Sequence, residues 1–194
     1  STQPSDDSSR AARRVERVLA RRVALLDSYI DKALAQDPGQ WMMLDGLPRD
    51  FVVYRYCRDT LQSWCHEFPI NNDNISQKDY VPFLADPHVG ALSPLLQVTD
   101  SLGYYNLGTR WYLAKSVGDS DVRVIAALEV MDESRRFGPG RGGWVNEHLR
   151  LSPKYSIRPL SFSGGAAVNV EGQPRFKGLL ESMAPGGGGG AAPA

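Results

Sequence analysis

The chain has 194 residues, of which 42% are hydrophobic and 23% are charged, values typical of a globular protein. This length is sufficient for one ordinary domain with a substantial core. The 22 basic residues balance the 22 acidic ones, so net charge gives no reason to expect nucleic acid or an acidic surface as a partner. There is no run of about 18 apolar residues, which excludes a membrane-spanning helix within this sequence.

The N-terminal part of the chain predicts a tail and a long helix. Residues 1–9 are polar, lack the apolar segment of a signal peptide, and are expected to form a disordered tail. From Arg10 to Ala35, apolar residues recur at spacings of three and four, which indicates a helix with one apolar stripe. Asp37-Pro38-Gly39 ends it. Six arginines lie within residues 10–22, a composition typical of a solvated helix face or of a segment beside a membrane.

The middle of the chain combines strand patterns with one short helix. Phe51–Cys57 is aromatic and β-branched, which predicts a strand. Asp59 or Thr60 is then expected to cap a short helix over Leu61–Glu67. The Gly-Asp-Ser-Asp segment at 118–121 predicts a hairpin turn. Consecutive strands are expected at Leu95–Thr99, Gly103–Leu107, Arg110–Val117 and Val122–Met131.

The C-terminal part is expected to hold short elements. Phe137–Gly143 predicts a flexible loop, and Val145–Leu151 a helical turn. Short strands are expected at Tyr155–Phe162, Ala166–Val170 and Pro174–Gly178. Residues 181–194 contain five consecutive glycines and predict a linker.

This order of elements predicts an α+β fold: a long N-terminal helix followed by a mostly antiparallel sheet with short inserted helices. We expect a single sensor domain over residues 10–180, with the long helix at 10–35 and an α+β body at 48–180. PAS-like and Cache-like sensor domains share this outline, although an outline alone does not establish function.

The sequence offers little that suggests catalysis. It lacks the P-loop, the dinucleotide-binding glycine motif and the common hydrolase motifs. Cys65 and His66 are adjacent, so on a helix their side chains would point in different directions and would not form a nucleophilic pair. The glycines around Arg141 have the composition to cradle an anion, but a hairpin-like loop is the preferred interpretation. We therefore predict no enzymatic activity, no cofactor and no metal.

The two cysteines, Cys57 and Cys65, predict free thiols. On one helix their Cα atoms would lie about 12 Å apart, whereas a disulfide requires less than about 7 Å. A bridge would need the chain to turn between them, so two buried free thiols are the preferred interpretation. No second pair is present to complete a zinc site.

Aromatic side chains are the most concentrated feature and suggest where a ligand binds. Strand alternation cannot place Tyr54 and Tyr56 on the same face as Arg55, so one set should face an edge, a pocket or a partner. For Arg55, Asp59 and Trp64, packing at a helix–strand junction is the preferred alternative to ligand binding. The candidate ligand-binding residues are Tyr54, Arg55, Tyr56, Trp64 and Trp111.

The segment Leu47–Ser76 carries a family resemblance. It resembles the periplasmic region between the first two membrane spans of Bacteroidetes-type membrane sensor histidine kinases, and weaker matches extend the resemblance over residues 40–178. The matching features are Leu47-Pro48, Tyr54-Arg55-Tyr56, Asp59–Trp64, Asn72-Asp73 with Ile75-Ser76, Ser93–Leu95, Tyr105–Leu113, Asn146, Leu149, Pro174 and Phe176-Lys177.

The resemblance implies an input domain on the periplasmic side of the inner membrane, tethered through flanking helices outside this chain. A ligand-induced shift of the long helix would then cross the membrane. The six arginines depart from the usual positive-inside bias. The kinase domains of the parent protein would lie elsewhere. The expected partners are a small ligand or an envelope protein, and a second copy through the N-terminal helix. The alternatives are a free-standing periplasmic binding protein or lipoprotein and, third, a small hydrolase that uses Cys65 or clustered acids.

Overall fold

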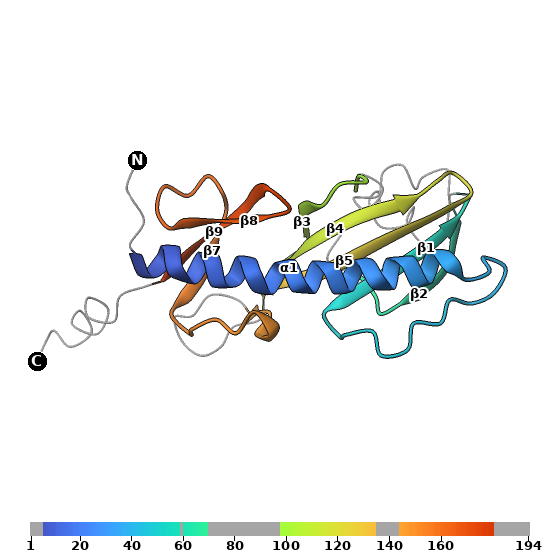
Figure 1. The fold of residues 1–194 in the computed structure, drawn as a ribbon, viewed down its shortest axis with the longest axis horizontal. Helices are drawn as coiled ribbons and strands as arrows, with labels where there is room; N and C mark the ends of the chain where they lie inside the picture. The colour runs from blue at the N-terminus through green and yellow to red at the C-terminus, as the bar shows by residue number, and fades with distance from the viewer. Residues whose placement is uncertain (1–5, 59, 70–97, 135–143, 181–194) are drawn as a thin grey trace, which may run out of the picture. The chain divides into compact units, whose positions relative to one another are not determined.

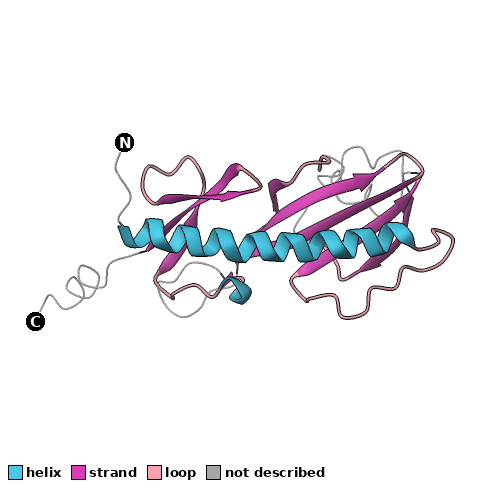
Figure 2. Cartoon of the chain, viewed as in Figure 1, coloured by secondary structure: helices cyan, strands magenta, loops and turns pink. Residues whose placement is uncertain are grey.

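The computed structural model describes residues 6–58, 60–69, 98–134 and 144–180. Asp59, residues 95–97 of the predicted strand, the predicted loop at 137–143 and the predicted linker at 181–194 lie outside the described residues. The chain divides into two compact units, Ser1–Arg21 with Glu147–Ala194 (unit 1) and Arg22–Asn146 (unit 2). The α+β class is confirmed (Figures 1 and 2). The boundary between the units falls inside the range predicted as one domain.

Helix α1 spans Asp6–Ala35 and contributes residues to both units. The predicted tail is wrong for residues 6–9, which are helical. Asp6 and Asp7 lie in the first turn, where carboxylates interact favourably with the helix dipole. Ser8 is buried, and its Oγ accepts a hydrogen bond from the backbone N–H of Leu180 at 3.2 Å. This contact is with a residue far away in the sequence, so local pattern did not reveal it.

Unit 2 is built on an antiparallel sheet with strand order β2-β1-β5-β4-β3, and β6 also pairs with β5. The strand predictions for β1, β3, β4 and β5 are confirmed, with small changes at their ends. Residues 98 and 99 are not in a strand. The strands are β1 (Phe51–Cys57), β2 (Thr60–Cys65), β3 (Gly103–Leu107), β4 (Arg110–Gly118), β5 (Val122–Asp132) and β6 (Trp144–Val145).

The short helix predicted over Leu61–Glu67 is wrong, because this segment forms β2. Arg58 adopts a φ of 50°, which reverses the chain so that β2 runs antiparallel to β1. Pairing with β1 supplies the backbone hydrogen bonds that a helix would otherwise have made, and tertiary pairing overrides local propensity here. The hairpin also separates the cysteines: Cys57 pairs with Thr60, whereas Cys65 pairs with Val53. Both thiols are free, as predicted, but they are partly exposed rather than buried.

Alternation along β1 gives the unit 2 sheet two different faces. Residues 22–35 of α1 lie along one side, which we call the helix face (Figure 1). Phe51 lies on the helix face, where its ring makes an edge contact with Tyr29 at 6.3 Å between centroids. We call the other side the aromatic face. Its buried cluster consists of Val52, Tyr54, Tyr56, Phe68, Val98, Leu107, Tyr112, Ala114, Ile125 and Ala127.

Unit 1 holds a three-stranded antiparallel sheet of order β7-β9-β8, preceded by a single 3-10 turn, η3 (Glu147–Leu149). The strands β7 (Tyr155–Arg158), β8 (Ala166–Val170) and β9 (Gln173–Leu180) confirm the predicted ones, except that β7 ends before Pro159, which has no N–H to continue a ladder. Glu16 of α1 accepts a hydrogen bond from the backbone N–H of Asn169 at 2.8 Å. A Cβ at Gly178 would lie 1.5 Å from the Tyr155 hydroxyl, so only glycine fits there.

Arg55 connects β1 to the C-terminal end of helix α1. It points to the helix face and is completely buried. Its Nη1 donates to the carbonyl of Ala33 at 3.0 Å, and its Nη2 donates to the carbonyl of Gln40 at 2.6 Å. Gln62 Oε1 accepts from the Arg55 Nε and Nη2 at 3.0 and 2.8 Å. Because the last carbonyls of a helix lack intrahelical donors and carry partial negative charge, a cation here satisfies both needs.

Replacement of Arg55 by methionine is expected to reduce the free energy of unfolding of the chain by about 3 kcal/mol or more. The reason is that each buried carbonyl left without a donor costs about 1–3 kcal/mol. Urea unfolding followed by circular dichroism measures the change. Arg58→Met is the control: this neighbouring arginine is exposed, and its replacement should change stability by less than about 0.5 kcal/mol. Equal effects of the two substitutions would contradict the role given to Arg55.

Candidate functional site

The five candidate ligand-binding residues lie in different places. Tyr54 and Tyr56 lie together in the cluster of the aromatic face. Arg55 points the opposite way, into the end of helix α1. Trp64, on the edge strand β2, lies opposite Tyr54 in the β1–β2 pairing and contacts Trp41 with ring centroids 4.7 Å apart. The structure therefore brings Tyr54 and Tyr56 together on the aromatic face, with Trp64 beside Tyr54 on the edge strand.

Trp111 lies away from Tyr54 and Tyr56. It is adjacent to Tyr112 in β4, so its side chain points to the other face of the sheet. There it stacks on Tyr104 with ring centroids 5.0 Å apart, and its Nε1 donates to Glu133 at 3.2 Å. These contacts give Trp111 a packing role at the β3–β4 edge of the sheet.

Three rings form the centre of the aromatic face. The Phe68 ring makes edge contacts with Tyr54 at 4.8 Å and with Tyr112 at 5.3 Å between centroids. The backbone N–H of Phe68 donates to the Tyr54 hydroxyl at 3.1 Å. Burial raises the pKa of Tyr54 to about 12, and burial also raises the pKa values of Tyr56 and Tyr112. All three tyrosines therefore stay neutral at physiological pH and keep a hydroxyl proton.

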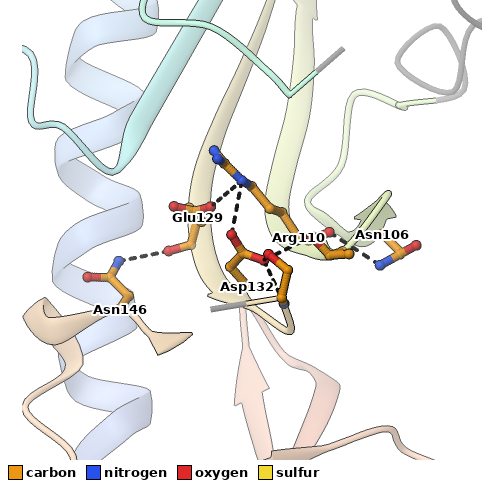
Figure 3. Close-up of polar contacts among 7 residues, drawn as sticks. Asn106, Arg110, Glu129, Asp132 and Asn146 are labelled. Atoms are coloured by element: carbon orange, nitrogen blue, oxygen red, sulfur yellow. Dashed lines mark hydrogen bonds and ion pairs between the residues drawn. The ribbon is translucent and has the colours of Figure 1, made fainter. Parts of the chain in front are cut away.

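A charged group continues the aromatic face beyond Tyr112. The Nε atom of Arg110 lies 3.5 Å from Glu129 Oε2 and 3.3 Å from Asp132 Oδ2 (Figure 3). We call these three residues the Arg110 cluster. The Arg110 side chain is 35% exposed, whereas those of Glu129 and Asp132 are 11% and 2% exposed. Arg110 is thus the accessible member of a largely buried group.

A β-bulge assembles the Arg110 cluster. Tyr112 pairs with Glu129 and Trp111 pairs with Met131, so Val130 is the extra residue of β5. In a regular ladder Arg110 would lie opposite Met131, but the bulge brings Asp132 opposite Arg110. Bulges commonly re-aim side chains next to functional sites. Here the bulge gives one arginine two carboxylate neighbours from the same strand.

Asp132 is held firmly in its charged form. Its Oδ1 accepts hydrogen bonds from the Thr109 hydroxyl at 2.9 Å and from the hydroxyl and N–H of Ser134 at 2.7 and 3.0 Å. Burial alone would raise the pKa of Asp132, but the hydrogen bonds from Ser134 and Thr109, together with the charge of Arg110, outweigh it and lower the pKa. Asp132 is therefore a fixed carboxylate that positions Arg110.

The arrangement provides charged, polar and apolar groups side by side. A partly accessible guanidinium, two carboxylates and a neutral phenol border a set of aromatic rings. Small-molecule sites combine apolar walls with a few such placed polar groups. Within the described residues, no group of three His, Cys, Asp or Glu side chains is arranged to hold a metal ion.

The sequence interpretation did not identify Arg110, Glu129 or Asp132. One signal was present. Pairing residues outward from the hairpin turn at 118–121 would have placed Arg110 of β4 opposite the end of β5. A regular pairing, however, would have put the Asp132 side chain on the face opposite to Arg110, because the bulge at Val130 is not evident from residue types.

No protein-family model, curated protein or solved structure matches the chain. In the part of the chain that the structure describes, no helix has both the length and the apolar character needed to cross a membrane. The site is therefore interpreted from its own geometry.

Replacement of Asp132 by asparagine is expected to lower stability at neutral pH, because Arg110 loses a charged partner. Folding lowers the pKa of Asp132, so its contribution is complete above the unfolded value of about 3.9 and is lost as the pH falls through the lower folded value. Wild type and variant should differ by a constant free energy of unfolding from pH 7 to about pH 4 and converge below it.

Urea unfolding over a pH series tests this expectation. Asp121→Asn replaces an exposed carboxylate and should differ little from wild type at any pH. A gap between wild type and Asp132→Asn that widens as the pH falls would contradict the expected role of Asp132.

Proposed function

We propose that this chain is the extracytoplasmic input domain of a two-component sensor histidine kinase, on the periplasmic side of the inner membrane. The resemblance of residues 40–178 suggested this function, and the construction of β1 supports it. The same strand carries Tyr54 and Tyr56 on the aromatic face and Arg55 on the C-terminal carbonyls of α1. A ligand that displaces β1 would therefore displace the end of the helix.

Helix α1 has the length required of an output element. Its 30 residues correspond to about 45 Å at the usual rise per residue. A buried stripe continues along it, with Val15, Leu19, Leu26 and Ile30 each at most 2% exposed. Packed helices shift by small translations between discrete positions. Ligand binding would favour one position of α1, and the parent protein would carry the kinase activity in other domains.

A small organic ligand with an apolar part and a charged part should raise the melting temperature of the isolated chain. At a ligand concentration of 100 times Kd the expected stabilisation is about 2.7 kcal/mol. The probes are amino acids, short carboxylic acids and aromatic amines, screened by thermal shift. Arg110→Gln and Tyr112→Phe should weaken the shift, because they remove the guanidinium and the neighbouring phenol.

Leu160→Ala is the control for the ligand screen. Leu160 is 42% exposed and belongs to unit 1, so its replacement should leave a ligand shift unchanged. A ligand whose effect is lost in Leu160→Ala and kept in Arg110→Gln would place binding away from the aromatic face.

The complete open reading frame tests the rest of the proposal. A membrane-spanning helix is expected before residue 1 and another after residue 194, followed by a histidine-containing dimerisation helix and an ATP-binding domain. A reading frame without a membrane span on either side would contradict an input domain. A lipobox upstream with no kinase downstream would instead support a free-standing lipoprotein.

A further inference from the structure

We infer that Asp50 and Asn146 join the Arg110 cluster to helix α1, so that a change at the candidate ligand site reaches the helix through consecutive polar contacts. The inference rests on the proposed function, because it names the route by which ligand binding would act on α1. All of the residues concerned belong to unit 2.

Asp50 lies directly before β1 and is 6% exposed. Its two carboxylate oxygens contact two different elements. Oδ1 accepts a hydrogen bond from Nη2 of Arg22, on α1, at 2.5 Å, and Oδ2 accepts one from Nδ2 of Asn146 at 2.7 Å. The Arg22 guanidinium also lies over the Phe51 ring, 4.7 Å from its centroid. Because separating a buried ion pair is costly, Asp50 and this part of the helix should move together.

Asn146 connects Asp50 to strand β5. It follows β6 and is 1% exposed. Its Nδ2 donates to the backbone carbonyl of Glu129 at 2.7 Å (Figure 3). The same Nδ2 also donates to Asp50. Its backbone N–H donates to the carbonyl of Val130 at 2.9 Å, and the N–H of Glu129 donates to the carbonyl of Asp50 at 2.8 Å. The backbone of β5 at residues 129–130 is therefore held by Asp50 and Asn146 together.

The same two residues of β5 shape the candidate site. The Glu129 side chain contacts Arg110 on the aromatic face, and Val130 is the extra residue of the bulge. A bulge leaves one residue unpaired and locally disrupts the ladder. A ligand that draws Arg110 away from Glu129 would shift this backbone, and the shift would pass to Asn146, Asp50 and Arg22.

A second polar contact joins α1 to the sheet and provides a control. Lys115 of β4 lies 2.9 Å from Asp27 of α1. Lys115 belongs to β4 five residues beyond Arg110, on the helix face, so it is not a step on the route from Arg110 to Arg22. The change in the free energy of unfolding caused by loss of the Asp27 charge should therefore be the same with and without the Arg110 guanidinium.

A double-mutant cycle on the purified chain without ligand tests the route. Arg110→Gln and Arg22→Gln are measured singly and together by urea unfolding. The unfolding equilibrium constant of the double variant should differ at least threefold from the value expected if the two effects were independent, because three residues link the two arginines. The Arg110→Gln and Asp27→Asn pair should show independent effects.

Removal of Asn146 should weaken the route, while the bond from the Glu129 N–H to the Asp50 carbonyl remains. In the Asn146→Ala background, the coupling between Arg110→Gln and Arg22→Gln should therefore be smaller. Arg110→Gln should also speed hydrogen exchange at helix amides 23–30 more in the presence of Asn146 than in its absence. If Asn146→Ala does not fold, Asn146→Ser, which keeps a small polar side chain, serves in the same cycle.

Independent effects of Arg110→Gln and Arg22→Gln would overturn the inference, and so would a coupling of undiminished size without Asn146. These measurements contain no ligand, so they do not depend on the success of the ligand screen. If the two arginines are coupled but the screen finds no ligand and the reading frame contains no flanking membrane spans, the proposed function is overturned and the inference is not.

Discussion

The burial of the Arg55 guanidinium at the end of helix α1 is the interaction on which the arrangement of unit 2 depends. Arg55 is fully buried on the helix face of β1, a position that a charged side chain tolerates only with a complete set of partners. The carbonyls of Ala33 and Gln40 and the amide oxygen of Gln62 supply these partners. One side chain thereby joins β1 to the last turn of the helix, to the connector that follows it and to β2.

The alternation of β1 gives this constraint a functional consequence. With Arg55 committed to the helix face, Tyr54 and Tyr56 have to lie on the aromatic face. A single strand therefore contacts both the candidate ligand site and the proposed output helix. The route through Asp50 and Asn146 reaches the same helix from β5, at residue 22 instead of at the C-terminal end. Two connections at separate points of α1 favour a rigid shift of the helix over local bending.

Buried polar groups specify the positions of the helix and strands of unit 2 more strictly than hydrophobic packing alone would. Asp50, Asn146 and Glu129 are each less than 9% exposed, and each has identified partners. Such groups are costly when a partner is lost, so they disfavour alternative positions of the helix and strands. The same property makes them sensitive to a ligand that competes for one of those partners.

The sequence by itself determined the class of the fold and most of its elements. The periodicity of α1, the β-branched and aromatic runs of β1, β4 and β5, and the turn at 118–121 are local signals that neighbouring residues carry. Only the tertiary structure decided that Thr60–Cys65 is a strand, because its hydrogen-bond partners belong to β1. The tertiary structure also decided that Arg110, Glu129 and Asp132 lie together, because this grouping depends on a bulge at Val130. Pairing register and the partners of buried charges arise from contacts between residues distant in the chain, and local sequence does not encode them.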